Sequence, residues 1–249
     1  MCSPSTCARN GLKFKSFAVS LITLFTILGV TGCSPSNIGD SSAIEFVDLF
    51  TTELPTPTID GNVSLEGTIH DRRSQRNFSD ESLTLQELSQ LLWAANGITD
   101  ESGRRSAPSA GGLYPLSVYV VAGNVEGLPA GLYRFVPDGH KLAKVVEGDF
   151  RQLFAEAANN QGMIADAPAS ILYAADFGVS EPRYGVERAQ KYVYIEVGHS
   201  AQNVYLQSVA LGLGTVAVGT VDESRTRRAL AFPENESLVY LMPLGAIAD

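Results

Sequence analysis

The chain is poor in cysteine, histidine and tryptophan, and this scarcity excludes several kinds of site. It has three Cys, three His and one Trp in 249 residues. Cys2, Cys7 and Cys33 all lie near the N-terminus, so the body of the chain has no cysteine for a disulfide, a thiolate nucleophile or a sulfur-ligated metal. The histidines, at positions 70, 140 and 199, do not follow a metal-ligand spacing such as i, i+4. We therefore expect neither a metal site nor cysteine-based catalysis.

The first 33 residues lack acidic side chains altogether. They hold three basic residues, then an apolar run over 17–30, and they end in small residues followed by Cys33. This order is typical of a secretory signal, and a cysteine after small residues resembles a bacterial lipobox, where the thiol is acylated. The run is short for a bilayer span of roughly 20 residues, so we favour a lipoprotein signal over 1–33 rather than an uncleaved anchor. We then expect the mature chain to be lipid-anchored at Cys33 in the bacterial cell envelope, outside the cytoplasm.

Without those residues the chain is strongly acidic, because 15 Lys and Arg then stand against 27 Asp and Glu. An acidic protein gains nothing from releasing the counterions of a polyanion, so nucleic acid is not expected as a partner. Residues 34–65 are rich in Ser, Thr, Pro and Gly, and we interpret them as a flexible tether with room for one short docking turn. Residues 66–249 form a segment long enough for one domain.

Within 66–249, helix and strand patterns alternate. Thr84 and Glu87 form a capping box that opens a helix ending at Asn96 and Gly97. Strands are predicted over 116–122, 132–135, 142–146, 169–175, 215–221 and 237–241, and further helices over 150–158 and after Asp222. The segment 190–211 predicts a long helix that is apolar on nearly every side, which is typical of a helix buried in a core or an interface. These elements predict a mixed α/β (α+β) domain with helices packed against a sheet.

Two short segments carry the strongest chemical signal. Residues 72–76 place three guanidinium groups and one hydroxyl within five positions. The planar fork of arginine bonds phosphate oxygens bidentately, which suits a phosphate monoester. Residues 108–115 begin as a loop of small side chains that leads into the strand at 116–122, and such a backbone can lie against a flat ring and bond its edge. A phosphate site and a flat-ring site together indicate a mononucleotide cofactor.

These two segments and three later ones, at 198–203, 212–215 and 243–245, resemble the nitroreductase-like FMN-dependent flavoprotein family. All five come in the family's order and cover roughly residues 54–249, with the SagB/ThcOx-type dehydrogenases as the most similar branch. The resemblance implies the nitroreductase-like fold, a central mixed, mainly antiparallel sheet flanked by helices with a long buried helix. It also implies an FMN cofactor and a homodimer with two flavins at the subunit interface.

The resemblance assigns a role to each segment. The first would hold the phosphate, and Arg76 would reach either the phosphate or the pyrimidine edge of the flavin. The small-residue loop would line the isoalloxazine, and two later residues would face the ring with their backbone amides. The expected cofactor-binding residues are Arg72, Arg73, Ser74, Arg76, Pro108, Ser109, Ala110, Gly111, Gly219 and Thr220. Many relatives carry a further basic residue after the closing Leu-Gly; this chain does not, so the phosphate site rests on residues 72–76 alone or borrows Arg104 or Arg105.

Lys191 and Tyr192 are the candidate catalytic pair. In azoline-oxidising members of the family, a Lys-Tyr pair near the start of the long helix is thought to abstract a proton, and this pair occupies a similar place. A desolvated lysine is able to take the proton that leaves while a thiazoline or oxazoline ring gives hydride to the flavin. The alternative is that Lys191 is a surface cation of the helix. His199 is interpreted as a hydrogen-bonded core residue rather than a catalyst.

The leading hypothesis for function is an FMN-dependent oxidoreductase of the nitroreductase type. Reduced nicotinamide, NAD(P)H, would deliver hydride to the flavin, which would reduce a small nitroaromatic or quinone-like acceptor. Free NAD(P)H is scarce outside the cytoplasm, which makes a SagB-type dehydrogenase that oxidises azoline-like rings in a peptide the runner-up. A flavin- or ligand-binding module without turnover is the third hypothesis.

Overall fold

The computed structural model of the protein describes residues 51–230 and 232–248. The predicted signal over 1–33, its Cys33 and the first part of the predicted tether lie outside the described residues. None of the helices in the described part of the chain has the length and apolar character that crossing a bilayer requires.

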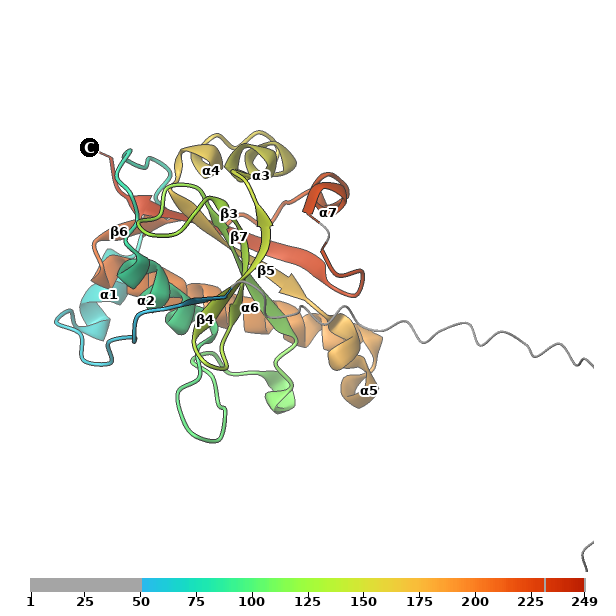
Figure 1. The fold of residues 1–249 in the computed structure, drawn as a ribbon. Coiled ribbons are helices and arrows are strands. Elements are labelled where there is room, and N and C mark those ends of the chain that lie inside the picture. The colour runs from blue at the N-terminus through green and yellow to red at the C-terminus, as the bar shows by residue number, and fades with distance from the viewer. Residues whose placement is uncertain (1–50, 231, 249) are drawn as a thin grey trace, which may run out of the picture. The chain divides into compact units, whose positions relative to one another are not determined.

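A seven-stranded sheet forms the centre of the domain (Figure 1). Its strand order is β1-β4-β3-β2-β5-β7-β6, and every pair of neighbouring strands is antiparallel. The strands are β1 (Thr51–Glu53), β2 (Leu116–Ala122), β3 (Gly131–Val136), β4 (Lys141–Glu147), β5 (Ala169–Ala175), β6 (Leu213–Thr215) and β7 (Ser237–Ala246). The mainly antiparallel sheet expected from the resemblance is therefore confirmed, and all neighbouring strands in the described part of the chain pair antiparallel.

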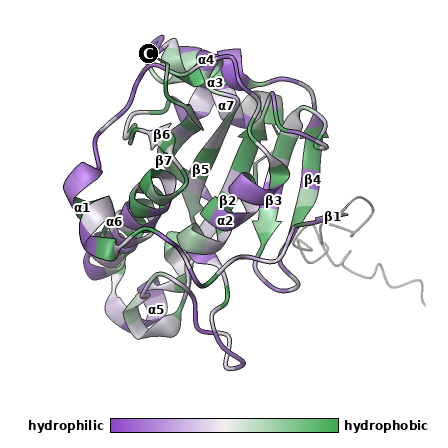
Figure 2. Ribbon diagram, turned by 90° about the vertical axis from the view of Figure 1, so that its left-hand side faces the viewer, coloured by the Kyte–Doolittle hydropathy of each residue, from purple (hydrophilic) through white to green (hydrophobic). Residues whose placement is uncertain are grey.

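Helices cover both faces of this sheet, so the domain has three layers. Figure 2 shows the hydrophobic strands at its centre. One core cluster joins the sheet to α2 (Leu85–Asn96) and α6 (Val186–Ala210), and the other joins it to α3 (Arg151–Ala157), α4 (Met163–Asp166) and α7 (Glu223–Leu230). The remaining helical pieces are α1 (Leu65–Asp71), α5 (Glu181–Tyr184) and two short 3-10 turns, η1 (Ala110–Gly112) and η2 (Phe177–Val179). Because both faces are covered, β5 is buried at every position.

The helix α2 begins where its capping signal predicts. The Glu87 N–H donates to Thr84 Oγ1 at 3.2 Å, and the Thr84 N–H donates to the Glu87 carboxylate at 2.9 Å. These two bonds satisfy backbone donors that have no partner inside the helix. Leu88, Leu91 and Leu92 then face the core, fully buried.

The predicted strand over 215–221 is wrong over most of its length. β6 ends at Thr215, and beyond it only Val218 makes a bridge, to Leu241. The backbone N–H of Ala217 donates to the hydroxyl of Tyr205 at 2.8 Å instead of joining a strand ladder. A side chain from a distant helix has taken the place of a strand partner, which the local apolar pattern does not reveal.

The predicted tether over 34–65 is wrong for its described part. β1 pairs with β4, with Thr51 opposite Ala143, and Leu54 is only 8% exposed. The N–H of Thr58 donates to Oε1 of Gln90 at 2.8 Å. The Ser, Thr and Pro content indicated a flexible segment, but its backbone groups find partners on β4 and α2, and composition carries no information about such partners.

The long helix α6 buries one face and exposes the other. Val193, Val197 and Val204 lie in the core, whereas Tyr194 is 57% exposed and Ile195 is 45% exposed. The burial that the sequence predicts for the long helix over 190–211 is confirmed for its core face. The other side carries large apolar side chains that stay partly exposed in the single chain, although the ring of Tyr194 contacts that of Phe177 edge-on, with centroids 5.8 Å apart.

Candidate functional site

Residues 72–76, called the arginine segment below, run beside the end strands of the sheet. The N–H of Gln75 donates to the carbonyl of Thr215 in β6 at 2.9 Å. Gly214 permits this approach, because a Cβ at that position would lie 2.8 Å from the Cβ of Gln75. The small residues at 212–215 thus hold the arginine segment against the sheet.

One tyrosine of α6 joins the arginine segment to the long helix. The hydroxyl of Ser74 lies 3.2 Å from that of Tyr205, and the guanidinium of Arg72 lies 5.2 Å from the centroid of the Tyr205 ring. The same hydroxyl accepts the hydrogen bond from Ala217 described above. Sequence reasoning missed Tyr205 as a site residue, because nothing in its local pattern sets it apart from the other tyrosines of the helix.

The donors of the arginine segment fit a phosphate group. Arg73 Nη1 donates to the carbonyls of His70 and Arg72, each at 2.8 Å, and Arg76 is exposed. Within 51–230 and 232–248, no carboxylate forms an ion pair with Arg72, Arg73 or Arg76. Clustered guanidinium groups without acidic partners suit an anion with several oxygens.

Gly219 and Thr220 lie on the same side of the domain as the arginine segment. They are exposed and follow Ala217, which is bonded to Tyr205. A Cβ on Gly219 would lie 3.7 Å from the ring of Tyr240. Burial raises the pKa of Tyr240, and the nearby Tyr205 raises it further. We call the arginine segment, Tyr205 and residues 217–220 the arginine half-site.

The loop at 108–112, called the serine–glycine loop, rests on α5. Gly111 and Gly112 have φ values of 65° and 66°, a region that glycine adopts without strain. A Cβ on Gly111 would lie 2.6 Å from the hydroxyl oxygen of Tyr184, so the loop packs closely against that side chain. Ser109 Oγ accepts a hydrogen bond from the N–H of Tyr114 at 2.9 Å, which fixes the start of the loop.

A cavity of about 250 Å³, called the loop cavity, lies between the serine–glycine loop and α6. Its lining residues are Pro108, Ser109, Ala110, Tyr192, Ile195, Glu196 and His199. Tyr192 packs edge-on against Tyr184, with ring centroids 4.9 Å apart. Lys191 is exposed and does not line the cavity. The structure therefore places Tyr192 at this site and leaves Lys191 on the surface of the single chain.

Two polar residues of the loop cavity, Glu196 and His199, were not expected there. Glu196 is only 4% exposed, and burial raises its pKa to about 7, against the opposing effects of a hydrogen bond with Ser109 and the charge of Arg105. His199 is exposed, so its interpretation as a core residue is wrong. Periodicity assigned the helix to the core, but it could not say which polar residues turn toward the loop.

Arg104 and Arg105 do not join the arginine segment within one chain. Arg104 pairs with Asp100 at 2.8 Å. Arg105 lies 4.5 Å from the centroid of the Tyr114 ring and acts on Glu196, so it belongs with the serine–glycine loop.

The arginine half-site and the loop cavity lie on opposite flanks of α6. At 3.6 residues per turn, Tyr205 points roughly 150° around the helix axis from the mean direction of Tyr192, Glu196 and His199. The exposed face of the helix, which includes Gln202, separates the two flanks. The described residues of one chain therefore hold the two halves of the predicted cofactor site apart.

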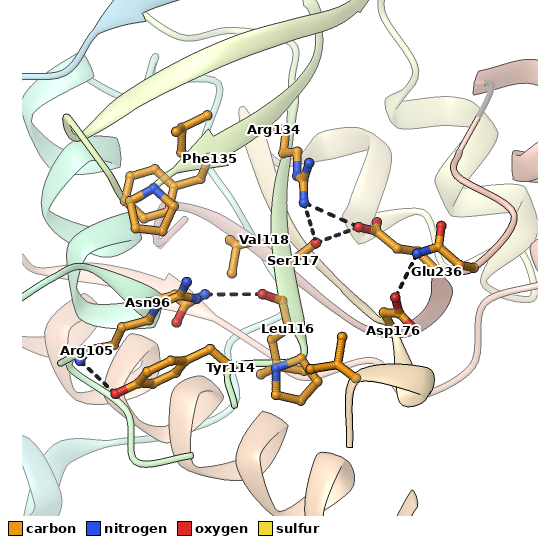
Figure 3. Close-up of a pocket in the computed structure, with 15 residues that line it drawn as sticks. Asn96, Arg105, Tyr114, Leu116, Ser117, Val118, Arg134, Phe135, Asp176 and Glu236 are labelled. Carbon is orange, nitrogen blue, oxygen red and sulfur yellow. Dashed lines mark hydrogen bonds and ion pairs between the residues drawn. The ribbon is translucent and has the colours of Figure 1, made fainter. Parts of the chain in front are cut away.

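Another cavity, of about 380 Å³, opens at the ends of β2 and β3 (Figure 3). Its buried Glu236 accepts hydrogen bonds from Ser117 Oγ and the Tyr119 hydroxyl, each at 2.6 Å, and pairs with Arg134 at 3.5 Å. Burial and this carboxylate raise the pKa of Tyr119, so its hydroxyl stays a neutral donor. The carboxylate is thus satisfied within the fold, and of the candidate site residues only Arg105, considered for the phosphate site, lines this cavity. Among the residues that the structure describes, no group of three or more His, Cys, Asp or Glu side chains is arranged to hold a metal ion.

Comparison with known proteins gives consistent matches over most of the chain. The model of the nitroreductase family matches residues 69–246. The nitroreductase-type protein MJ1384 of Methanocaldococcus jannaschii is 41% identical over 195 residues, which are 78% of this chain and 96% of that protein. A nitroreductase-type crystal structure from Ralstonia eutropha has a TM-score of 0.71 at 30% identity, covering 80% of this chain and 90% of the other.

Two further solved structures share the fold at lower identity. The Escherichia coli microcin synthetase McbBCD complex has a chain with a TM-score of 0.62 at 21% identity, covering 87% of this chain and 85% of that one. The NADPH:FMN oxidoreductase of Vibrio harveyi has a TM-score of 0.54 at 20% identity, covering 74% and 69%. These two likenesses concern the fold alone.

Proposed function

The chain belongs to the nitroreductase family, whose members are oxidoreductases, and from this premise we propose that it is an FMN-dependent oxidoreductase. In this proposal, hydride passes from NAD(P)H to a small nitroaromatic or quinone-like acceptor. The observation that carries it is the chemistry of the two half-sites. One presents guanidinium groups without acidic partners, and the other presents a glycine-containing backbone beside a small cavity.

The residues present fit FMN. Arg72, Arg73 and Ser74 would hold the phosphate, and Arg76 would reach the phosphate or the pyrimidine edge of the ring. The backbone of the serine–glycine loop would lie against the isoalloxazine, and Gly219 and Thr220 would face it. FMN, when bound, would supply the hydride-transfer chemistry. The shared fold of the Vibrio harveyi enzyme, whose name gives NADPH and FMN, supports this choice.

We propose further that the functional unit is a homodimer in which each site takes one half from each chain. Because the half-sites lie on opposite flanks of α6, a second chain is needed to bring a serine–glycine loop to an arginine segment. The exposed Ile195 lies on the face between the flanks, and the exposed Tyr194 lies on the Tyr205 flank, about three turns nearer the start of the helix. A two-fold axis across this face makes a self-complementary interface and completes two equivalent sites.

Reconstitution with FMN tests the proposed function. The purified protein is mixed with FMN and dialysed, and its absorbance at about 450 nm reports bound flavin. Loss of that absorbance on adding NADPH or NADH without oxygen, and its return on adding 1,4-benzoquinone, supports the oxidoreductase. A protein that retains no FMN contradicts the proposal, and one that retains FMN without any redox turnover favours a binding module.

A second candidate, a dehydrogenase that oxidises azoline-like rings in a peptide, is favoured by one observation. Tyr192 lines the loop cavity beside the serine–glycine loop. The shared fold of the microcin synthetase chain supports this candidate, whereas the exposed Lys191 does not supply the desolvated base it needs. Flavin reduction by a thiazoline-containing peptide, with no nicotinamide present, distinguishes it from the leading proposal.

We also propose that the chain is exported and anchored to the bacterial cell envelope through a lipid on Cys33. The support is the order of basic, apolar and small residues over 1–33. An enzyme in that location works where free NAD(P)H is scarce, so identifying its electron donor is part of establishing its function.

A further inference from the structure

The loop cavity holds a buried carboxyl group that cofactor binding does not use. Tyr192, Glu196 and His199 are spaced i, i+4 and i+7, so they share one face of α6. Glu196 is 4% exposed and reaches the cavity wall, together with Ser109 and Ala110 of the serine–glycine loop. Keeping a carboxylate charged and out of water is costly unless it is paired or hydrogen-bonded, and otherwise the group shifts toward its protonated form.

The surroundings of Glu196 leave its charge only partly compensated. Ser109 hydrogen-bonds to the carboxylate, and Arg105 acts on it from the loop after α2. Within 51–230 and 232–248, no Lys, Arg or His side chain lies within 4.0 Å of the Glu196 carboxylate, the limit for an ion pair. The other titratable groups at this cavity are Tyr192 and His199. Burial therefore dominates and brings the pKa of Glu196 to about 7, where a carboxyl both gives and takes a proton readily.

We propose that the Glu196 carboxyl donates the proton that completes reduction of a small acceptor bound at the mouth of the loop cavity, beside the flavin ring that the serine–glycine loop would hold. This inference rests on the proposed function. Reduction of a quinone to a hydroquinone adds two electrons and two protons. NAD(P)H supplies the electrons, and one proton travels with them as hydride. The second proton passes from Glu196 to the developing oxyanion of the acceptor, and the carboxyl becomes a carboxylate.

The geometry also gives a route by which Glu196 regains its proton. His199 lies on the same face of α6, about one turn further along, lines the same cavity and is exposed to solvent. In this proposal Glu196 regains its proton from solvent on this exposed side of the cavity. Each reduced acceptor then consumes one proton from solvent, and Glu196 is protonated again at the end of the cycle.

The cavity also limits the class of acceptor. Pro108, Tyr192 and Ile195 supply flat and apolar walls, and Glu196 supplies the single acidic proton donor. A one- or two-ring quinone, with an oxygen that takes up a proton on reduction, fits these features.

The test compares E196Q with E187Q, which removes an exposed carboxyl from the first turn of the same helix. Infrared spectroscopy follows the carbonyl band of the protonated carboxyl during a pH titration, and this measurement does not depend on turnover. Reduction of 1,4-benzoquinone by the FMN-loaded protein with NADPH is then measured against pH. Circular dichroism and absorbance at about 450 nm check folding and bound FMN in every sample.

The wild type and E187Q are expected to lose an acid band with a midpoint near pH 7, and E196Q is expected to lack that band. Because the donor is the protonated form, the wild-type rate falls as pH rises through about 7. E196Q loses about 100-fold in rate below that pH and loses the pH dependence.

An acid band that persists in E196Q, or an E196Q rate and pH profile equal to those of the wild type, overturns the inference. If E196Q does not fold, a wild-type protein without any acid that titrates between about pH 6 and 8 overturns it instead. A wild type that retains no FMN is a different outcome, read from the visible absorbance alone, and it overturns the proposed function itself.

Discussion

The hydroxyl groups of Ser74 and Tyr205 lie 3.2 Å apart, although 131 positions separate them in the sequence. This contact joins the arginine segment to α6, and the hydrogen bond from Ala217 to the same tyrosine joins residues 217–220 to both. One phenol therefore assembles the arginine half-site from three distant parts of the chain.

Replacing Tyr205 with Phe should loosen the arginine half-site. The change leaves the N–H of Ala217 without its acceptor, which should lower the free energy of unfolding by about 1–2 kcal/mol. Denaturant titration measures this, and equilibrium dialysis should show weaker FMN retention. Tyr194→Phe is the matched control, since its side chain is 57% exposed, belongs to neither half-site and keeps its apolar ring at the proposed interface. Equal effects of the two changes would remove Tyr205 from its assembling role.

The double change Arg72→Ala and Ser74→Ala should release FMN. Hydrogen bonds to a charged group contribute about 1.5–3 kcal/mol, so losing both donors should weaken FMN binding by about 100-fold or more. Fluorescence of free FMN after dialysis measures the loss. Arg225→Ala, which alters a half-exposed arginine on α7, should retain FMN as the wild type does. Unchanged retention in the double variant would exclude these residues from the phosphate site.

Gly214→Ala should displace the arginine segment. The new Cβ would lie 2.8 Å from the Cβ of Gln75 and 2.9 Å from Ile247 Cγ1, and such overpacking costs about 1–3 kcal/mol. We expect a lower melting temperature together with reduced FMN retention. Gly61→Ala is the control, because nothing lies within 4 Å of its added Cβ. A Gly214→Ala protein as stable as this control would show that the close approach is not required.

Tyr194→Glu should dissociate the proposed dimer. A carboxylate on the exposed face of α6 would be buried without a partner in the interface, which is strongly unfavourable. Sedimentation velocity should give a monomer, and the monomer should lose FMN because each site needs both chains. Ile59→Glu changes a side chain that is 79% exposed and distant in sequence from α6, and it should leave the dimer intact. A Tyr194→Glu dimer with bound FMN would place the interface elsewhere.

Cys33→Ala should abolish lipid attachment. In a bacterial host that exports the full chain, labelled palmitate should be incorporated into the wild type and not into the variant. Cys7→Ala, within the predicted signal, should be labelled like the wild type. Labelling that survives in Cys33→Ala, or a wild type that stays unlabelled, would rule out the proposed anchor.

Local patterns in the sequence predicted the parts of this fold that depend on neighbouring residues. The capping box at Thr84 places the start of α2, and the apolar runs place β2 and β5 at the residues where the structure has them. The arginine segment and the serine–glycine loop were also recognisable, because each carries its chemistry within a few consecutive residues. The resemblance to the nitroreductase family added the sheet and the roles of these segments.

Only the tertiary structure decided how those segments relate to one another. The separation of the two half-sites across α6, the burial of Glu196, the exposure of His199 and the assembling role of Tyr205 all depend on which elements pack against that helix. Periodicity indicates that a helix has a buried side, but burial and hydrogen bonding of a given side chain are set by residues far away in the sequence. For this reason the sequence by itself determined the chemical parts of the site, and the packing of distant elements determined their arrangement.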